Sequence, residues 1–132
     1  MILDTSFLVE LLRGKNDNVK AKAEELDKSF ETKAIASISV MELWMGALKS
    51  AQQEKEKKKI GLLLKSLLVY DFTENDAKKA GEIEAELLKK GKMIDLEDIM
   101  LAGVALLRNE KVLTLNAKHF ENIEDLELEN LD

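Results

Sequence analysis

The sequence predicts an α/β fold, a three-layer α/β/α sandwich in which helices cover both faces of a central, mostly parallel sheet. Short apolar runs alternate with longer segments of helical periodicity, a pattern typical of parallel strands joined by crossover helices. The runs MIL, AIA and VLTL are apolar at nearly every position, as strands buried on both faces are. At 132 residues the chain fits one domain, so we expect a single domain over residues 1–132.

The first strand is expected at residues 1–3 and leads directly into a helix. Asp4, Thr5 or Ser6 can cap that helix, whose apolar pattern FLVELLRG ends at Gly14. An acid that follows a buried parallel strand lies at the carboxyl edge of the sheet, where open α/β sheets bind ligands.

A second helix is expected over residues 17–31, followed by a short strand at residues 34–36. The helix has apolar positions at Val19, Ala23, Leu26 and Phe30. Ser39 can cap the next helix, in which Glu42 interrupts an apolar pattern. Four apolar residues of this helix can either pack in the core or form an apolar groove for a partner helix, and we expect them in the core. They are Met41, Trp44, Met45 and Leu48.

The second half of the chain repeats the alternation of helices and strands. A helix over residues 52–66 carries EKEKKK as a solvated face, and LLVYDF at residues 67–72 reads as a strand. Thr73 is expected to cap a long helix that continues through Lys90 and ends at Gly91.

The last third adds one more helix and two strands. The helix starts near Asp95, and VLTL at residues 112–115 follows it as a strand. LELEN near the end predicts a short edge strand.

The composition restricts the chemistry. A net charge of −6 disfavours non-specific binding to a phosphate backbone, although acids gathered around a metal ion reverse the local field. Without cysteine, and with His119 as the one histidine, a metal site must use mainly oxygen ligands, which favours Mg²⁺ or Mn²⁺. Because no apolar run approaches the roughly 18 residues of a membrane span and no export signal is recognisable, we expect a cytoplasmic protein without a membrane partner.

Three acids lie in short apolar contexts near predicted helix starts: Asp4, Glu42 and Asp98. Each has a plain structural explanation alone, as a cap, a solvated side chain and an anion in a first helical turn. In a parallel sheet these helix starts meet at one edge, and carboxylates gathered there repel one another unless a cation binds. The sequence therefore predicts a divalent-metal site.

Other polar residues accompany these acids. Those that can position water or phosphate oxygens are Thr5, Ser6, Thr114 and Asn116. Asp95 and Glu97 are weaker ligand candidates, because Asp95 is expected to cap its helix.

Four elements in this order resemble the PIN-domain ribonucleases, and more narrowly the VapC-type toxins of prokaryotic toxin–antitoxin pairs. They are DTSFLVELLRG, S-x-x-E-x-x-x-G from Ser39, G-x-x-I-x-x-x-D-x-x-L-A from Gly91, and T-x-N-x-x-H-F from Thr114. The resemblance runs from Met1 to about residue 128. It implies metal-dependent RNA cleavage by the matching acids, Asp4, Glu42 and Asp98.

The resemblance also implies an RNA substrate, a homodimer and a small antitoxin protein that blocks the site. Cleavage would leave a 5′-phosphate and a 3′-hydroxyl. Many PIN domains carry a fourth acid where this chain has Asn116, so the second metal position of some members stays open here. Phe120 is expected in the core, and His119 in a surface or structural role rather than a catalytic one.

Substrate contacts must come from cations outside the acid cluster. The predicted phosphate contacts are Arg13, Lys92 and Lys118, although solvation alone accounts for most surface lysines.

Other classes of protein are also compatible with parts of the pattern. A phosphoacceptor signalling domain needs an aspartate after a middle strand, for which Asp71 is available, and a haloacid-type phosphatase needs an aspartate where Ser6 stands. A catalytically silent PIN fold would carry the same acids and bind RNA or protein without cleaving.

Overall fold

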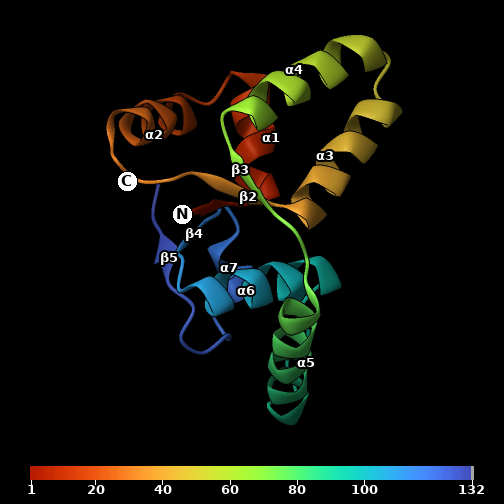
Figure 1. Cartoon of the computed structure of the whole chain (residues 1–132), viewed down its shortest axis with the longest axis vertical. Coiled ribbons are helices and arrows are strands. Elements are labelled where there is room, and N and C mark those ends of the chain that lie inside the picture. The colour runs from red at the N-terminus through yellow and green to blue at the C-terminus, as the bar shows by residue number, and fades with distance from the viewer. Residues whose placement is uncertain (132) are drawn as a thin grey trace.

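A computed structural model describes residues 1–131 as a five-stranded sheet enclosed by helices (Figure 1). The strands are β1 (Ile2–Leu3), β2 (Ala34–Ala36), β3 (Leu68–Tyr70), β4 (Val112–Leu113) and β5 (Leu128–Glu129). The helices are α1 (Thr5–Arg13), α2 (Asp17–Lys28), α3 (Ser37–Lys49), α4 (Gln53–Lys65), α5 (Glu74–Lys89), α6 (Leu96–Arg108) and α7 (Ala117–Phe120).

The sheet has the order β3-β2-β1-β4-β5, and each of its pairings is parallel. The central strand β1 pairs with β2 on one side and with β4 on the other, so that Ile2 lies opposite both Ala34 and Val112. The chain order reverses beside β1, which makes the carboxyl end of β1 the topological switch point of the sheet. The predicted α/β sandwich and its short edge strand near the C-terminus are confirmed.

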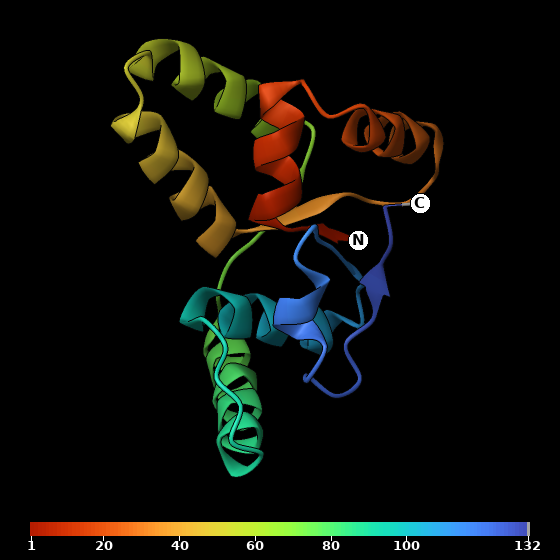
Figure 2. The same cartoon turned by 180° about the vertical axis from the view of Figure 1, so that it is seen from behind.

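Helices α1 to α4 lie on one side of the sheet and α5 to α7 on the other, as Figure 1 and the reverse view in Figure 2 show. Successive strand residues explain these two layers, because neighbouring side chains of a strand point to opposite faces. Ile2 and Val112 belong to the core beneath α5, α6 and α7, whereas Leu3 and Leu113 belong to the core beneath α1 to α4. The three central strands β1, β2 and β4 thus contribute to both cores.

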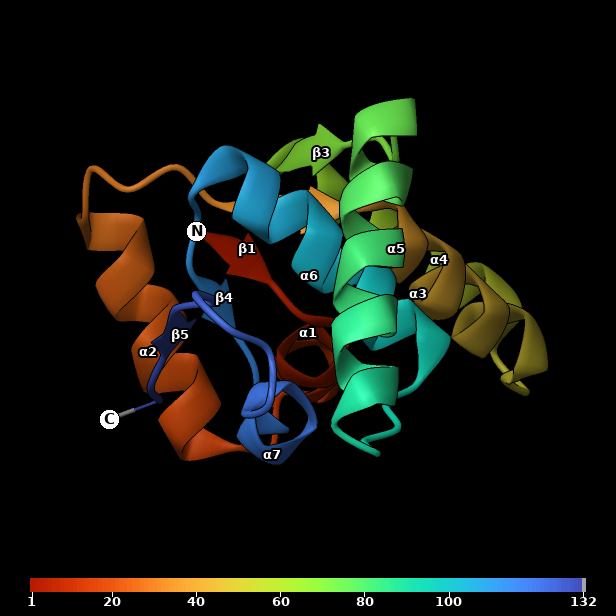
Figure 3. The same cartoon turned by 90° about the horizontal axis from the view of Figure 1, so that it is seen from below.

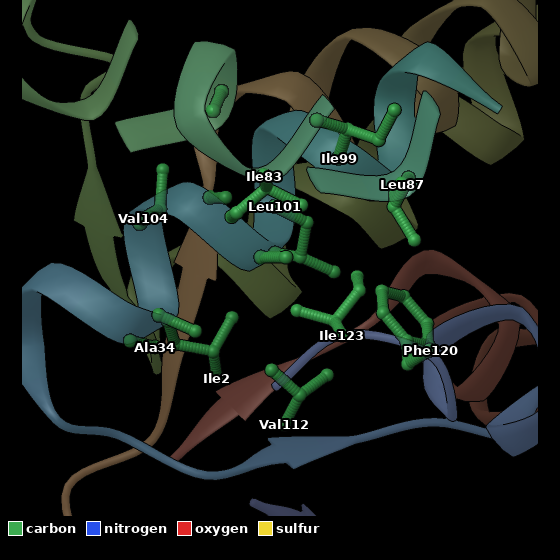
Figure 4. Packing of buried hydrophobic residues seen from close by; sticks show 14 residues of the cluster. Ile2, Ala34, Ile83, Leu87, Ile99, Leu101, Val104, Val112, Phe120 and Ile123 are labelled. Carbon is green, nitrogen blue, oxygen red and sulfur yellow. The ribbon is translucent and has the colours of Figure 1, made fainter. Parts of the chain in front are cut away.

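In the core beneath α5 to α7, the side chains of Ile2 and Val112 point toward the layer that carries Leu101 and Ile123 (Figure 4). Figure 3, a view from below, shows α5 and α6 in front of the sheet. Their backbones pack closely at Gly103, where a Cβ would lie 2.9 Å from the carbonyl oxygen of Asp76. A larger residue at position 103 would separate the two helices.

The predicted capping residues lie at the start of α5 and after the ends of α1 and α5. The hydroxyl of Thr73 accepts a hydrogen bond from the amide of Asp76, whose carboxylate accepts one from the amide of Thr73, so α5 begins with a capping box. Gly14 and Gly91 follow α1 and α5 with φ angles of 70° and 68°, which glycine adopts without strain. Among residues 1–131, no helix has the length and apolar character needed to cross a membrane.

Three local predictions are wrong. Helix α2 ends at Lys28, because the hydroxyl of Ser29 donates to the carbonyl of Leu26 and the chain turns, which leaves Phe30 fully exposed. Helix α3 begins at Ser37, so Ser39 lies within its first turn, buried, instead of capping it.

The third error concerns the outer face of α3. Leu43 and Ala47 bury the inner face of this helix in the core shared with α1 and α4. The residues expected in the core lie on the opposite side and are 41–54% exposed: Met41, Trp44, Met45 and Leu48.

Candidate metal centre at the carboxyl edge of the sheet

Asp4 lies at the switch point, directly after β1, and is only 6% exposed. Its backbone carbonyl accepts hydrogen bonds from the amides of Phe7 and Leu8 and so starts α1, but its side chain makes no capping bond. Oδ2 of Asp4 instead accepts hydrogen bonds from the hydroxyls of Thr114, at 2.7 Å, and Ser6, at 2.9 Å. The carboxylate is therefore available for a role other than helix capping.

Backbone amides hold these two hydroxyls in place. The amide of Leu115 donates to Oγ of Ser6 at 3.0 Å, and the amide of Asn116 donates to Oγ1 of Thr114 at 2.9 Å. Because each hydroxyl accepts from the backbone, its proton is directed to Asp4. The segment after β4 thus fixes the carboxylate that follows β1, through one of its two oxygens.

Glu42 lies in α3, partly buried, and its Oε1 accepts a hydrogen bond of 2.8 Å from the hydroxyl of Thr5. Burial raises the pKa of Glu42, the Thr5 hydrogen bond opposes that rise, and repulsion from the carboxylates of Asp4 and Asp98 adds to it. These three acids, from positions far apart in the chain, therefore act on one another electrostatically.

Asp98 lies in the first turn of α6 with its side chain 17% exposed. Nδ1 of His119, in α7, is 3.0 Å from Oδ2 of Asp98. Burial raises the pKa of Asp98, the His119 hydrogen bond opposes the rise, and the Asp4 carboxylate adds to it. Raised pKa values of this kind show that the site disfavours uncompensated negative charge.

A cation would relieve this repulsion, and the donor set suits one. The three carboxylates offer hard oxygen ligands, and each has one oxygen already hydrogen-bonded to the protein. One of these acids, Asp98, also forms a group with Asp95 and His119 in which one possible ligand atom of each residue lies within 4.8 Å of the others. This cluster of acidic residues can bind a metal ion.

The remaining predicted site residues lie around this edge. Asn116 is exposed and contributes its backbone amide, and the described contacts include no hydrogen bond from its side chain. Arg13 is exposed, pairs with Glu10 at 2.8 Å and lines a groove together with Glu42. Lys92 and Lys118 are exposed. Their roles toward substrate stay predictions.

The sequence made Asp95 a weaker ligand candidate and gave His119 a surface or structural role, but it did not predict that both would lie beside Asp98. Asp95 is the N-cap residue of α6 but makes no side-chain capping bond, contrary to expectation. Its spacing of three residues from Asp98 on a helix was a usable signal. His119 carried no such signal, because its contact with Asp98 depends on how α7 packs. The buried side chain of Phe120 fixes α7 in the core, and this brings His119 to Asp98.

The acid required by the phosphoacceptor alternative lies elsewhere. Asp71 is exposed and follows the edge strand β3, which β2 separates from β1. Ser6, at the position where a haloacid-type phosphatase needs an aspartate, serves as a donor to Asp4. The residues that a phosphoacceptor domain or a haloacid-type phosphatase needs are therefore not brought together beside Asp4.

A parallel sheet with acids gathered at its switch point defines a class of metal-binding α/β proteins, and comparison with known proteins narrows that class. The chain belongs to the PIN domain family, which matches residues 1–126. Ribonuclease VapC2 of Rickettsia felis is 34% identical over 131 residues, covering 99% of this chain and 97% of the relative. The tRNA(fMet)-specific endonuclease VapC of Salmonella typhimurium is 31% identical over 129 residues, covering 98% and 96%.

Solved structures show the same similarity. The crystal structure of VapBC2 from Rickettsia felis bound to a DNA fragment from their promoter contains a chain that matches with a TM-score of 0.91 and 34% identity, covering 99% of this chain and 98% of that one. DNA-bound VapBC from Salmonella typhimurium matches with a TM-score of 0.91 and 30% identity, covering 99% and 97%. The fold of the PIN family is thus shared over nearly the whole chain.

Proposed function

We propose that this protein is a divalent-metal-dependent endoribonuclease that hydrolyses RNA phosphodiester bonds as the toxin of a toxin–antitoxin pair. The observation that supports the proposal is that the Asp4 carboxylate raises the pKa of both Glu42 and Asp98, while each of the three carboxylates is hydrogen-bonded to a neighbouring side chain. Relatives named as VapC ribonucleases, at 29–34% identity over nearly the whole chain, support this choice of chemistry.

Asp4 and Asp98 would hold Mg²⁺ or Mn²⁺, and Glu42 would bind it directly or through water. When bound, such an ion lowers the pKa of a coordinated water and neutralises charge that develops on the phosphate. Thr5 holds Oε1 of Glu42, which leaves Oε2 to accept a hydrogen bond from the attacking water and orient it. Ser6 and Thr114 keep the Asp4 carboxylate from rotating out of position.

Cations beside the acids would hold the RNA backbone. Arg13 has a side chain that is 65% exposed and lines the groove that Glu42 also lines, so it can reach a phosphate next to the scissile one. We propose the same type of contact for Lys92 and Lys118, both exposed. Each such contact adds an attraction that salt weakens.

We propose that a small antitoxin protein binds the groove between α1, α3 and α4. This groove, of about 320 Å³, is lined by Glu42 and by apolar residues that include Leu12, Leu43 and Ile60. A segment bound there would meet the acid cluster, where a basic side chain would compete with the metal ion. Relatives solved as VapBC complexes support a partner of this type.

We further propose a homodimer that uses the outer face of α3. Met41, Trp44, Met45 and Leu48 expose apolar surface together on this helix, and contiguous exposed apolar surface marks interaction sites. Two copies that pack these faces would remove the surface from water.

Cleavage of a fluorophore-labelled, mixed-sequence RNA tests the ribonuclease proposal. We expect cutting with Mn²⁺ or Mg²⁺ that EDTA and Asp4→Asn each abolish. Asp71→Asn, which removes an exposed acid at the edge strand, is the matched control and should cut like the wild type. Cutting that survives EDTA would contradict the proposal, and confirmed Mn²⁺ binding without any cutting would favour a silent RNA- or protein-binding module.

A further inference from the structure

The three acids of the site share one structural feature. In each, one carboxylate oxygen accepts a hydrogen bond from a residue on a different turn or element: Oδ2 of Asp4 from Thr114, Oε1 of Glu42 from Thr5, and Oδ2 of Asp98 with Nδ1 of His119. The distances are 2.7, 2.8 and 3.0 Å. The remaining oxygens of Asp4 and Asp98 are left for a cation, and that of Glu42 for the cation or for a water bound to it.

We infer that His119 is a positioning residue of the metal centre, which holds Asp98 in the orientation that binds the ion. This inference rests on the proposed function. An ionised carboxylate can only accept hydrogen bonds, so Nδ1 of His119 must carry the proton. Residues that hydrogen-bond to metal ligands in this way fix ligand orientation, and their loss typically lowers metal affinity 10–100-fold.

The local fold supports this role. His119 lies in the single turn of α7, next to Phe120, which is 1% exposed and belongs to the core beneath α5 to α7. Phe120 therefore fixes the position of α7, and the imidazole, half-exposed at 48%, contributes little to the core itself. The hydrogen bond spans 21 residues and ties α7 to the first turn of α6.

A competing arrangement would make His119 a metal ligand together with Asp95 and Asp98, because their ligand atoms lie within 4.8 Å of one another. The positioning role accounts for more of the geometry. It gives Asp98 the same kind of donor that Asp4 and Glu42 have, and it leaves an all-oxygen ligand set, which Mg²⁺ and Mn²⁺ prefer.

Mn²⁺ titration of tag-free protein by calorimetry tests the inference without reference to RNA cleavage. We expect His119→Ala to weaken Mn²⁺ binding about 10–100-fold, and His119→Asn, whose amide can donate to Asp98, to restore part of the affinity. Glu121→Ala, an exposed neighbour, is the control and should bind like the wild type. Cooperative thermal unfolding of all four proteins in EDTA shows that each one is folded.

Unchanged Mn²⁺ affinity in His119→Ala would overturn the positioning role. If Asp98→Asn also left the affinity unchanged, the proposed metal centre itself would be wrong, and the two failures are thus distinguishable. Since the chain has one histidine, the imidazole nitrogen signals in an NMR spectrum are unambiguous. We expect Nδ1 to keep its proton when Mg²⁺ or Zn²⁺ is added, and a shift of a ring nitrogen into the metal-bound range would show a ligand and contradict the inference.

Discussion

The hydroxyl of Thr114 donates a 2.7 Å hydrogen bond to Oδ2 of Asp4, across 110 positions of the chain. Both residues are 6% exposed, and they follow the neighbouring parallel strands β4 and β1. The bond exists because parallel strands end at the same edge of a sheet. It fixes the carboxylate at the switch point and connects the fold directly to the proposed chemistry.

Thr114→Val tests this relationship. The methyl group fills the space of the hydroxyl but leaves Asp4 without one donor and the amide of Asn116 without its acceptor. We expect Mn²⁺ affinity to fall about 10–100-fold and the free energy of unfolding to fall by about 1–3 kcal/mol. Calorimetry and urea unfolding measure the two effects. Thr32→Val, at an exposed site, should change neither, and wild-type affinity in Thr114→Val would refute this account of Asp4.

Asp98→Asn should stabilise the metal-free protein at pH 7 and remove its stabilisation by Mn²⁺. Because burial raises the pKa of Asp98, the folded state holds the proton more tightly than the unfolded state, and folding stability declines as pH rises above about 4. The asparagine side chain of Asp98→Asn carries no charge and so removes this loss of folding stability. The melting temperature in EDTA should therefore rise by a few degrees. Thermal unfolding with and without millimolar Mn²⁺ measures both effects.

Asp71→Asn serves as the control for Asp98→Asn and should melt like the wild type in EDTA and in Mn²⁺. A lower melting temperature of Asp98→Asn in EDTA, or a Mn²⁺ shift equal to that of the wild type, would be the contrary result.

Asp76 should give the fold an opposite dependence on pH. Burial raises the pKa of Asp76, but hydrogen bonds from Arg108, at 2.7 Å, and from Thr73 outweigh burial and lower it. The stability from this group is therefore fully present above the unfolded value of about 4 and is lost as pH falls through the folded value.

Asp76→Asn leaves the Arg108 guanidinium without its charged partner and should cost about 3–5 kcal/mol in urea unfolding at pH 7. The difference from the wild type should narrow at pH 3, below the unfolded value of about 4, because the unfolded chain then binds a proton that the folded carboxylate resists. Glu74→Gln, which removes only an exposed pair with Lys78, should cost less than about 1 kcal/mol. An equal loss at both pH values would argue against the lowered pKa of Asp76.

Trp44→Asp should convert the proposed dimer to a monomer, because it places a charge in the apolar outer face of α3. Sedimentation velocity at micromolar concentration measures the state of assembly. Phe30→Asp, at a fully exposed aromatic residue outside that face, should leave the dimer intact. A wild-type protein that sediments as a monomer would count against the homodimer.

The sequence predicted the architecture well because the signals were local. Apolar strands, the Thr73 cap and the glycines after α1 and α5 depend on near neighbours, and they specify where most elements begin and end. The outward face of α3 was not predictable, because apolar residues occupy both faces of that helix and only packing decides which is buried.

The candidate site was predictable in part for the same reason. Asp4 precedes the first residue of α1 and Asp98 lies in the first turn of α6, whereas Glu42 lies in the second turn of α3. The parallel topology was enough to predict a common edge for them, and the effect of Asp4 and Asp98 on the pKa of Glu42 fits that prediction. The contact between His119 and Asp98 depends on how α7 docks on the sheet, a long-range feature with no local pattern. Likewise, the backbone hydrogen bond from Asn116 to Thr114 had no signal in the sequence, and the role of the Asn116 side chain toward water or phosphate stays a prediction.

The chemical ends of cleaved RNA test the central claim most directly. If the acids activate a metal-bound water, the products should carry a 5′-phosphate and a 3′-hydroxyl, as mass spectrometry of a cut oligonucleotide would show, and Asp98→Asn should yield none. A 2′,3′-cyclic phosphate would mean that the RNA's own 2′-hydroxyl attacks, and it would contradict the water-based mechanism proposed for these acids.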